Sequence, residues 1–457
     1  MPKLRVLIEL DQPQPEAFTR HAAALRSSLE TFRQSESAAS KLSGLGLEII
    51  GDYPPVPLFQ ERVVRGLEGV PGFAAFAAPT TNPDMPAATV VLRGEIEPDR
   101  LEELKTRPGV KVFPDSRLTL YPRKAAGPKD KESASQVDCP PFQPPVSALV
   151  IRSMLGVGPL FQSGYRGQGV VVGILDEGIN GSVYPVAGGF ARRNAQLPGQ
   201  ASITSHGSMC AADVLVAAPS ATLFDYPFLG IPDSGGALAM FQAVLEQRRR
   251  NGTPQVLSNS YGFVGVPRKP SNPNHEIYDL NHPLHRKIRE VVASGAVVFF
   301  AAGNCGSPCP SGRCLPSGIG PGQSIHGSNS LSEVITIAAV NCHGTRIGYS
   351  SQGPGMFHPQ KPDLAAYTHF HGNFGPGRPG GQSESPYDNG TSAACPVAAG
   401  VAALLLSVFG PLDSAVLKAA LLESAWNPDG RTGWNPETGC GILSASTACE
   451  KLSEQRP

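Results

Sequence analysis

Apolar residues follow a different pattern before and after about residue 148. From there onward, five near-continuous apolar runs alternate with segments that have helical spacing. Strands buried on both faces have this appearance, because helices cover both sides of a parallel sheet. The pattern predicts strands at 169–176, 221–228, 254–260, 296–304 and 334–340, and helices at 235–250, 283–294, 392–408 and 413–425. This part is therefore expected to be an α/β domain with a mostly parallel sheet flanked by helices.

The chain before residue 122 has shorter β-branched runs. Strands are predicted at 5–10, 47–51, 88–96 and 109–115, and helices at 16–33 and 98–105. The order βαββαβ is typical of a small α+β domain of the ferredoxin-like kind. Residues 52–87 contain seven prolines and few periodic features, so they are expected to form an irregular insertion.

Length and charge agree with two globular domains and a linker. The 457 residues exceed what one hydrophobic core usually organises. Residues 122–147 combine charge, serine and proline, as linkers do. We therefore expect a first domain at 1–121, the linker at 122–147 and a large domain at 148–453. Lysine plus arginine and aspartate plus glutamate both number 38, so neither nucleic acid nor a membrane is an expected partner.

The N-terminus does not resemble a secretory signal. Its short apolar run ends at Glu9 and Asp11, and no small-residue cleavage pattern follows. The longest apolar run, at 400–410, is about half the roughly 18 to 20 residues that a membrane helix needs. We expect a soluble protein that is cytoplasmic as encoded, with export by a non-classical route left open.

Three residues with acid, base and alcohol side chains lie at the ends of predicted elements. Asp176 ends an apolar strand, His206 precedes a glycine and an apolar helix start, and Ser392 opens a long apolar helix. Active sites in open parallel sheets gather at the carboxyl ends of the strands. Each residue alone would more often be a turn or capping residue. Their joint occurrence favours a catalytic set.

The local patterns at these residues resemble the subtilisin-like serine protease family. Asp176 lies in D-x-G, His206 in H-G-S and Ser392 in G-T-S-x-A-x-P, in the family's chain order. Asn304 in AAGN matches the family's oxyanion asparagine, and SNSYG at 258–262 resembles its substrate-lining strand. The resemblance implies a serine endopeptidase with a subtilisin-like fold, preceded by an inhibitor-type prodomain.

The resemblance also assigns a role to each residue. Ser392 would be the nucleophile, His206 its base and later the acid, and Asp176 the carboxylate that orients the imidazole. Asn304 and the Ser392 N–H would stabilise the oxyanion. Peptide substrates would pair with an edge strand, and the predicted substrate-binding residues are Ser260, Tyr261, Gly262, Ala302 and Gly303. The chemistry requires no cofactor and no catalytic metal, and structural calcium is left open.

Three positions depart from the family's pattern. Glu177 stands where a serine or threonine usually follows the aspartate, so a hydroxyl donor to Asp176 is missing. Met209 replaces a second histidine and Ala212 replaces a glycine. None of these changes removes a group that the chemistry requires, so we expect an active enzyme.

The cysteines and the remaining histidines have several interpretations. Cys305, Cys309 and Cys314 follow Asn304 directly, and Cys342 follows the next strand; the four could bind zinc, form disulfides in an exported protein, or stay reduced. Cys210 and Cys395 lie in apolar helical runs and are expected to be small buried hydrophobes. The pairs His282 and His285, and His369 and His371, are expected to be isolated surface or loop histidines.

The end of the first domain resembles the end of a family prodomain, which inhibits its own enzyme. By that match Tyr121 would occupy the first specificity pocket, but Pro122 follows and should make cutting there poor. Long loops at 263–283, 305–328 and 370–388 leave open a dedicated processing protease for one peptide precursor. A catalytically silent peptide-binding homologue is the other alternative.

Overall fold

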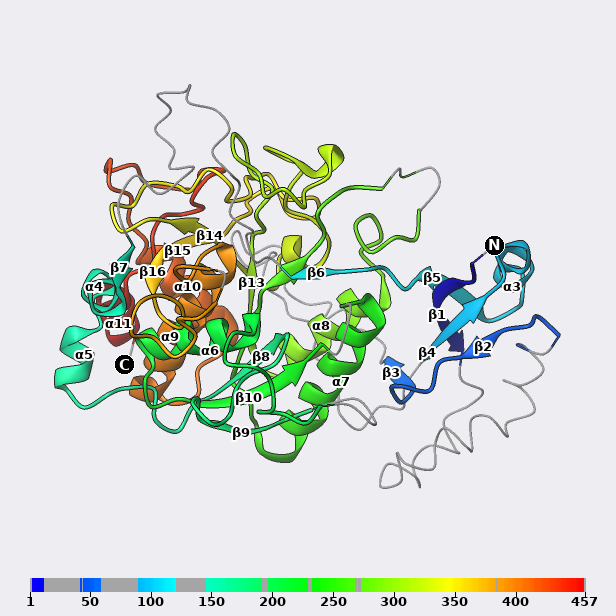
Figure 1. Cartoon of the computed structure of the whole chain (residues 1–457), viewed down its shortest axis with the longest axis horizontal. Helices are drawn as coiled ribbons and strands as arrows, with labels where there is room; N and C mark the ends of the chain where they lie inside the picture. The colour runs from blue at the N-terminus through cyan, green and yellow to red at the C-terminus, as the bar shows by residue number, and fades with distance from the viewer. Residues whose placement is uncertain are drawn as a thin grey trace.

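The computed structural model describes residues 2–11, 42, 44–58, 89–120, 145–190, 196–228, 232–267, 269, 273–383 and 385–455. Figure 1 shows a large body, which contains the main sheet with its surrounding helices, and a smaller sheet beside it near the N-terminus.

A seven-stranded parallel sheet forms the centre of the large body. Its order is β15-β14-β13-β11-β8-β10-β9. The strands are β8 (Val171–Asp176), β9 (Val186–Gly189), β10 (Thr222–Pro227), β11 (Val256–Asn259), β13 (Val297–Ala301), β14 (Ile335–Val340) and β15 (Leu364–Tyr367). The five predicted strands are present, and β9 and β15 were not predicted. The expected α/β class with a mostly parallel sheet is confirmed.

Helices cover both faces of this sheet, as the alternation along β13 illustrates. Val297, Phe299 and Ala301 pack into one apolar core, and Val298 and Phe300 pack into the other. The first core includes α4 (Ala148–Leu155), α5 (Gly158–Gln162), α6 (His206–Ala217), α9 (Thr391–Phe409), α10 (Ser414–Glu423) and α11 (Ala445–Glu454), and the second includes α7 (Ser234–Asn251) and α8 (Pro283–Ala293). The sequence pattern did not predict α4, α5 or α11.

The α9 helix is apolar all round because it runs through the core. Over its 19 residues it contains a window of mean hydropathy 2.0 that is 83% buried inside the protein. By length and composition alone it could cross a membrane, but here other elements of the large body enclose it. The burial positions its first turn, which carries Ser392, inside the molecule.

The smaller sheet is antiparallel and contains β1 (Leu4–Asp11), β2 (Glu48–Ile49), β3 (Val56–Leu58), β4 (Thr89–Ile96) and β5 (Val110–Pro114). Its order is β2-β4-β1-β5, with β3 also on β4. A turn of 3-10 helix, η2 (Pro98–Arg100), leads into α3 (Leu101–Lys105) where a short helix was predicted. The helix predicted at 16–33 lies outside the described residues, so the ferredoxin-like assignment stays a prediction. Most of the insertion at 52–87 also lies outside them.

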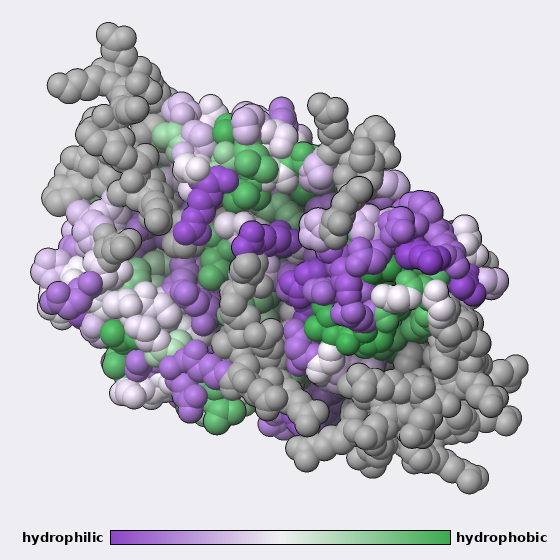
Figure 2. All heavy atoms as spheres, turned by 45° about the vertical axis from the view of Figure 1, so that its right-hand side comes forward, coloured by the Kyte–Doolittle hydropathy of each residue, from purple (hydrophilic) through white to green (hydrophobic). Residues whose placement is uncertain are grey.

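Two short strand pairs link the segment around the predicted linker to the large body. β6 (Thr119–Leu120) pairs antiparallel with β12 (Tyr261–Gly262), and Figure 1 shows β6 reaching from the small sheet to the large body. β7 (Val146–Ser147) pairs with β16 (Phe370–His371). Two further 3-10 turns, η4 (Pro316–Gly318) and η5 (Gly327–Ser330), lie in the long loop after β13. Figure 2 shows polar side chains interspersed with apolar ones over the face turned toward the viewer.

Candidate active site

Asp176 and His206 form a buried hydrogen-bonded pair. Asp176 is the last residue of β8, in the middle of the sheet, and His206 is the first residue of α6. Their Oδ1 and Nδ1 atoms are 2.6 Å apart, and both residues are buried. Burial by itself would lower the pKa of His206, but the charge and hydrogen bond of Asp176 and the charge of Glu177 outweigh it and raise the pKa. The Asp176 carboxylate therefore stabilises positive charge on the imidazole when it forms.

Two donors hold the Asp176 carboxylate where a family hydroxyl is missing. The Glu177 N–H donates to Asp176 Oδ1 at 2.7 Å, and the Cys210 thiol lies 3.6 Å from Asp176 Oδ2. Glu177 also acts on the other member of the pair, because its Oε2 accepts the His206 N–H at 2.8 Å. A carboxylate at a helix N-terminus is favourable. The backbone N–H of Glu177 and the Cys210 thiol thus orient Asp176, although Glu177 has no hydroxyl to donate.

The Cys210 thiol contacts this site, so the expectation of a merely hydrophobic cysteine was incomplete. Burial raises its pKa well above the usual value, and nearby carboxylates add to the effect, so the sulfur keeps its hydrogen. Asp176, His206 and Cys210 offer ligand atoms within 4.8 Å of one another. A metal ligand must be a thiolate, whereas the Cys210 thiol keeps its hydrogen, and the His206 ring is hydrogen-bonded to Asp176. We therefore interpret the three residues as a hydrogen-bonded group and not as a metal site. Cys210 lies four residues after His206, about one helical turn, and this spacing in the sequence could have indicated that the two side chains are neighbours.

Ser392 lies in the first turn of α9, directly after Gly390 and Thr391. Gly390 has a φ of 85°, a conformation that L side chains rarely adopt, and it sets the turn into the helix. Ser392 is buried, and its main-chain oxygen accepts the Ser260 hydroxyl at 3.3 Å. Among the described residues, Ser392 Oγ and His206 Nε2 are both buried and have no hydrogen-bond partner. The structure therefore shows no hydrogen bond between these two atoms.

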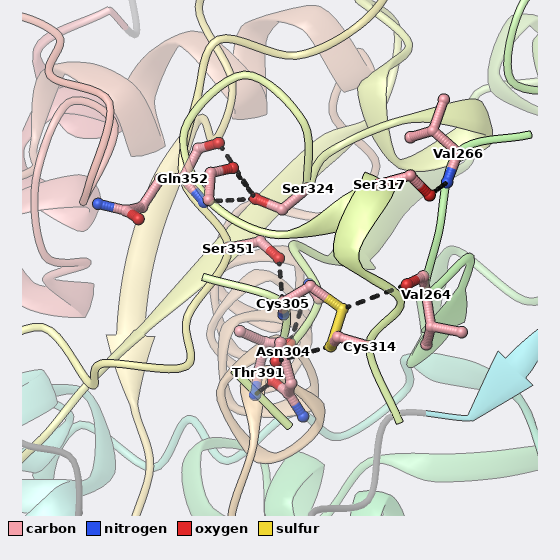
Figure 3. Close-up of a disulfide and its surroundings, with 12 residues drawn as sticks. Val264, Val266, Asn304, Cys305, Cys314, Ser317, Ser324, Ser351, Gln352 and Thr391 are labelled. Atoms are coloured by element: carbon pink, nitrogen blue, oxygen red, sulfur yellow. Dashed lines mark hydrogen bonds between the residues drawn. A yellow bond between two sulfur atoms is a disulfide. The ribbon is translucent and has the colours of Figure 1, made fainter. Parts of the chain in front are cut away.

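The Asn304 amide is held by the residue that precedes Ser392. Its Oδ1 accepts both the N–H and the hydroxyl of Thr391, at 2.9 and 3.0 Å. Figure 3 shows Asn304 and Thr391 side by side, below a disulfide. Because the oxygen end of the amide is fixed as an acceptor, the Nδ2 end is directed elsewhere as a donor. Thr391, the threonine of the G-T-S pattern, was not among the predicted site residues.

The cysteines after Asn304 form disulfides. Cys305 and Cys314 are bonded to each other, with nine residues of separation, and Cys309 is also disulfide-bonded. Cys342 is free. Three of the four proposed zinc ligands are therefore already used, and the disulfide alternative describes this cluster.

The predicted substrate-binding residues lie on two neighbouring segments. Tyr261 and Gly262 form β12, which is paired with β6, while Ser260 contacts Ser392. The Ala302 N–H donates to Ile337 O, and the Gly303 N–H donates to the Thr391 hydroxyl at 3.1 Å. Gly303 has a φ of 105°, which favours glycine as the chain turns from β13 to Asn304. Tyr261 and Gly262 thus lie on β12, with Ser260 directly before them, and Ala302 and Gly303 directly precede Asn304.

The expectation of surface or loop histidines is only partly right, because His282 and His369 lie outside helices and strands but none of the four is exposed. His282 and His285 are fully buried at the start of α8, and His282 Nδ1 accepts the Leu284 N–H. Burial lowers the pKa of His282 to about 3 and that of His285 well below its usual value, so both stay neutral. His369 is also buried and hydrogen-bonds the Tyr349 hydroxyl at 2.9 Å, and His371 is half-buried. The expectation of exposure failed because burial here depends on long-range packing.

Comparisons with known proteins find similarity to the subtilase family. A model of the subtilase family matches residues 167–441. Subtilisin DY of Bacillus licheniformis is 28% identical over 300 residues, which cover 63% of this chain and 93% of that protein. Serine protease AprX of Bacillus subtilis is 28% identical over 326 residues, which cover 62% of this chain and 66% of AprX.

Two further relatives are similar over only part of their own length. A calcium-dependent protease of Trichormus variabilis is 26% identical over 351 residues, which cover 64% of this chain and 47% of that protein. The crystal structure of fervidolysin from Fervidobacterium pennivorans, a keratinolytic enzyme related to subtilisin, has a TM-score of 0.60. That structure is 16% identical, and the alignment covers 98% of this chain and 61% of fervidolysin, so the likeness shows the fold.

Proposed function

The chain belongs to the subtilase family. From that membership we propose that its residues Asp176, His206 and Ser392 catalyse the hydrolysis of peptide bonds. The family and its relatives give the enzyme class, a serine endopeptidase. The observation that best supports the assignment of residues is the 2.6 Å bond between Asp176 and the His206 ring. It leaves Nε2 as the ring atom that can accept a proton from Ser392.

The first chemical step needs a base for the serine hydroxyl. Ser392 Oγ attacks the carbonyl carbon of the scissile peptide bond while its proton passes to His206 Nε2. The imidazolium that results is stabilised by Asp176, whose influence already raises the pKa of His206. His206 then donates that proton to the leaving amine, which leaves an acyl group on Ser392. Water, activated by the same imidazole, releases the acid.

The oxygen of the attacked carbonyl becomes an anion and needs donors. The Asn304 amide, fixed through its oxygen by Thr391, and the Ser392 N–H at the start of α9 are the proposed donors. Such donors are already in place, so little reorganisation is needed when the charge forms. Every group in the proposed chemistry is a side chain or a backbone N–H, so no cofactor enters it.

An active-site probe tests the residue assignment. We expect an organophosphonate or sulfonyl fluoride probe to label Ser392 in the parent and to leave the Ser392→Ala variant unlabelled. Ser163→Ala, at an exposed serine of the same chain, is the control and should label like the parent. Peptide-bond hydrolysis should disappear with the label. A parent that stays unlabelled even after residues 1–121 have been removed by cleavage in the linker would favour the catalytically silent peptide-binding alternative.

We also propose that residues 1–121 act as an intramolecular inhibitor. The supporting observation is β6, whose Leu120 and Thr119 pair antiparallel with Tyr261 and Gly262, the strand expected to bind substrate. A peptide strand added at this edge would make the same main-chain hydrogen bonds as a substrate. While β6 occupies β12, a second peptide cannot pair there.

Charged side chains join the small sheet to the large body. Arg93 on β4 is 2.9 Å from both Asp115 and Asp233, and Asp233 caps α7 in the large body. Burial by itself would lower the pKa of Arg93, but the surrounding carboxylates raise it, so the guanidinium stays charged. Glu9 and Arg286 form a second ion pair at 2.5 Å. Because these partners are largely buried, separating the two parts would leave charges to be resolvated.

Apolar packing supports the same contact. Leu7, Phe113 and Leu118 pack in one core with residues of α7 and α8, including Phe241 and Ile288. The Leu118 N–H also donates to Pro232 O at 2.8 Å. A segment docked through a shared core and paired with the substrate strand suits an inhibitor that stays bound after its linker is cut.

A further inference from the structure

A disulfide-closed loop holds an arginine beside the proposed oxyanion residue. The loop runs from Cys305, directly after Asn304, to Cys314. The Ser311 N–H donates to Asn304 O at 2.8 Å, and the Leu315 N–H donates to Val264 O at 2.7 Å. Figure 3 shows this disulfide between Asn304 and Val264. The loop is therefore attached at both of its ends, and the position of its residues relative to Asn304 is fixed by the backbone.

Arg313 projects from this loop toward the strand that occupies the substrate edge. Its Nη1 donates to Leu120 O at 3.4 Å. A small cavity is lined by Leu120, Asn304, Arg313 and the disulfide. The positive charge of Arg313 is also among the influences that lower the pKa of His206, which places it within electrostatic reach of the proposed base. Arg313 thus lies beside the position that a substrate side chain next to the scissile bond would take.

The charge of Arg313 has no carboxylate partner within the described ranges of the chain. Arg93, Arg286 and Arg346 each have a carboxylate within 4.0 Å, whereas no such pair involves Arg313 in the described residues. The acidic groups nearest the proposed reaction centre are engaged, since Asp176 bonds His206 and Glu177 accepts the His206 N–H. A guanidinium offers a planar fork of donors that matches a carboxylate.

We propose that Arg313 selects an acidic side chain, glutamate or aspartate, at the substrate residue that contributes the scissile carbonyl. The inference rests on the proposed peptidase function, because it places the cavity beside the reacting bond. An incoming carboxylate would enter the cavity between Asn304 and Arg313 and bond the guanidinium. The residue that follows Leu120 in this chain is Tyr121, which carries no carboxylate. The inhibitor segment therefore lacks the feature that the cavity selects, as suits a segment that occupies the cleft without being cut rapidly.

Paired peptides test this selection directly. The full-length protein and the form that it yields by self-cleavage are both assayed on a set of peptides. The peptides differ only in the residue that contributes the scissile carbonyl, which is glutamate, glutamine or lysine. We expect kcat/KM for the glutamate peptide to exceed that for the glutamine peptide by about tenfold. This value lies between the few-fold effect of an exposed ion pair and the larger effect of a buried charged hydrogen bond. The ratio should fall at high salt, since an exposed charge is screened.

Variants assign the preference to Arg313. Arg313→Gln should bring the glutamate-to-glutamine ratio close to one, Arg313→Glu should favour lysine, and Arg313→Lys should keep the preference for glutamate. Arg431→Gln, at an exposed arginine outside the cavity, is the control and should keep the parent ratio. A parent ratio near one, or an unchanged ratio in Arg313→Gln, overturns the proposal. If Ser392 labels with the probe and peptides are cut without acidic preference, only this inference fails; if Ser392 does not label and no peptide is cut, the proposed function fails.

Discussion

Two buried carboxyl groups lie next to Gly372, on the chain segments that lead to the proposed site. Asp213 on α6 and Asp388, four residues before Ser392, are both fully buried. Their oxygen atoms lie 2.7 and 2.1 Å from the place that a Cβ on Gly372 would take. Asp388 accepts the N–H groups of Asn373 and Phe374, at 2.5 and 2.6 Å. No N–H or O–H group of the described residues outside this pair donates to Asp213.

Burial raises the pKa of the two carboxyls to different extents. Burial raises the pKa of Asp213 well above its usual value, and the charge of Asp388 and a hydrogen bond to it add to the effect. Burial also raises the pKa of Asp388, but only to about 6, because its backbone donors favour the anion. Arg378 faces both groups, and Tyr184 also lies near them. The pKa of Asp213 is thus raised further than that of Asp388, so a single proton on the pair resides on Asp213.

We expect Asp213→Asn to remove a pH-dependent loss of stability. In the unfolded chain an aspartate loses its proton above about pH 3.9, whereas folded Asp213 keeps it. The unfolded state then binds fewer protons, so the free energy of unfolding of the parent falls as pH rises, by about 1.4 kcal/mol per pH unit. An asparagine amide can donate the same hydrogen bond but has no proton to lose. From pH 5 to 7 the unfolding free energy of the variant should therefore rise relative to that of the parent, by at most about 1.4 kcal/mol per pH unit.

Urea unfolding at pH 5, 6 and 7 measures this difference. Both proteins carry Ser392→Ala, so that self-digestion does not affect the curves. Asp413→Asn is the control: Asp413 caps α10 by accepting the Ala415 N–H, a role that asparagine also performs. The control should differ from the parent by an amount that does not change with pH. Unfolding free energies of Asp213→Asn and the parent that stay parallel from pH 5 to 7 would refute the assignment of this proton to Asp213.

Three further predictions concern the oxyanion residue, the disulfides and the first domain. Asn304→Ala should lower kcat about 10² to 10³-fold with a much smaller change in KM, because the amide serves an anion present only near the transition state; an effect on KM alone would contradict that role. Thiol counting under denaturing, non-reducing conditions should find fewer than the nine cysteines of the chain, and nine reactive thiols would exclude the bridge between Cys305 and Cys314. Intact-mass measurement should show the 47.9 kDa parent shortened by cleavage between Arg123 and Pro145 and the Ser392→Ala variant undivided; a fully active, undivided parent would eliminate the inhibitor proposal.

The amino-acid sequence determined the large domain's main elements and the candidate site because both are encoded locally. An apolar run such as 296–304 forms a buried strand wherever it lies in the sheet, and it became β13 (Val297–Ala301). Asp176, His206 and Ser392 were found because each lies at an element end within a recognisable short pattern. The elements that the pattern missed are short or partly exposed, as in β9 (Val186–Gly189), whose residues alternate between half-buried and exposed.

Only the tertiary structure decided which distant residues meet. Asp213 and Asp388 lie far apart in the sequence, as do Arg313 and Leu120, and no periodic pattern relates the members of either pair. The histidines of α8 became buried because the small sheet and the large body share one apolar core with that helix. Burial and long-range contact depend on the strand order β15-β14-β13-β11-β8-β10-β9, in which neighbours in space are often not neighbours in the chain. Local spacing carries no record of that order, since it results from packing many segments at once.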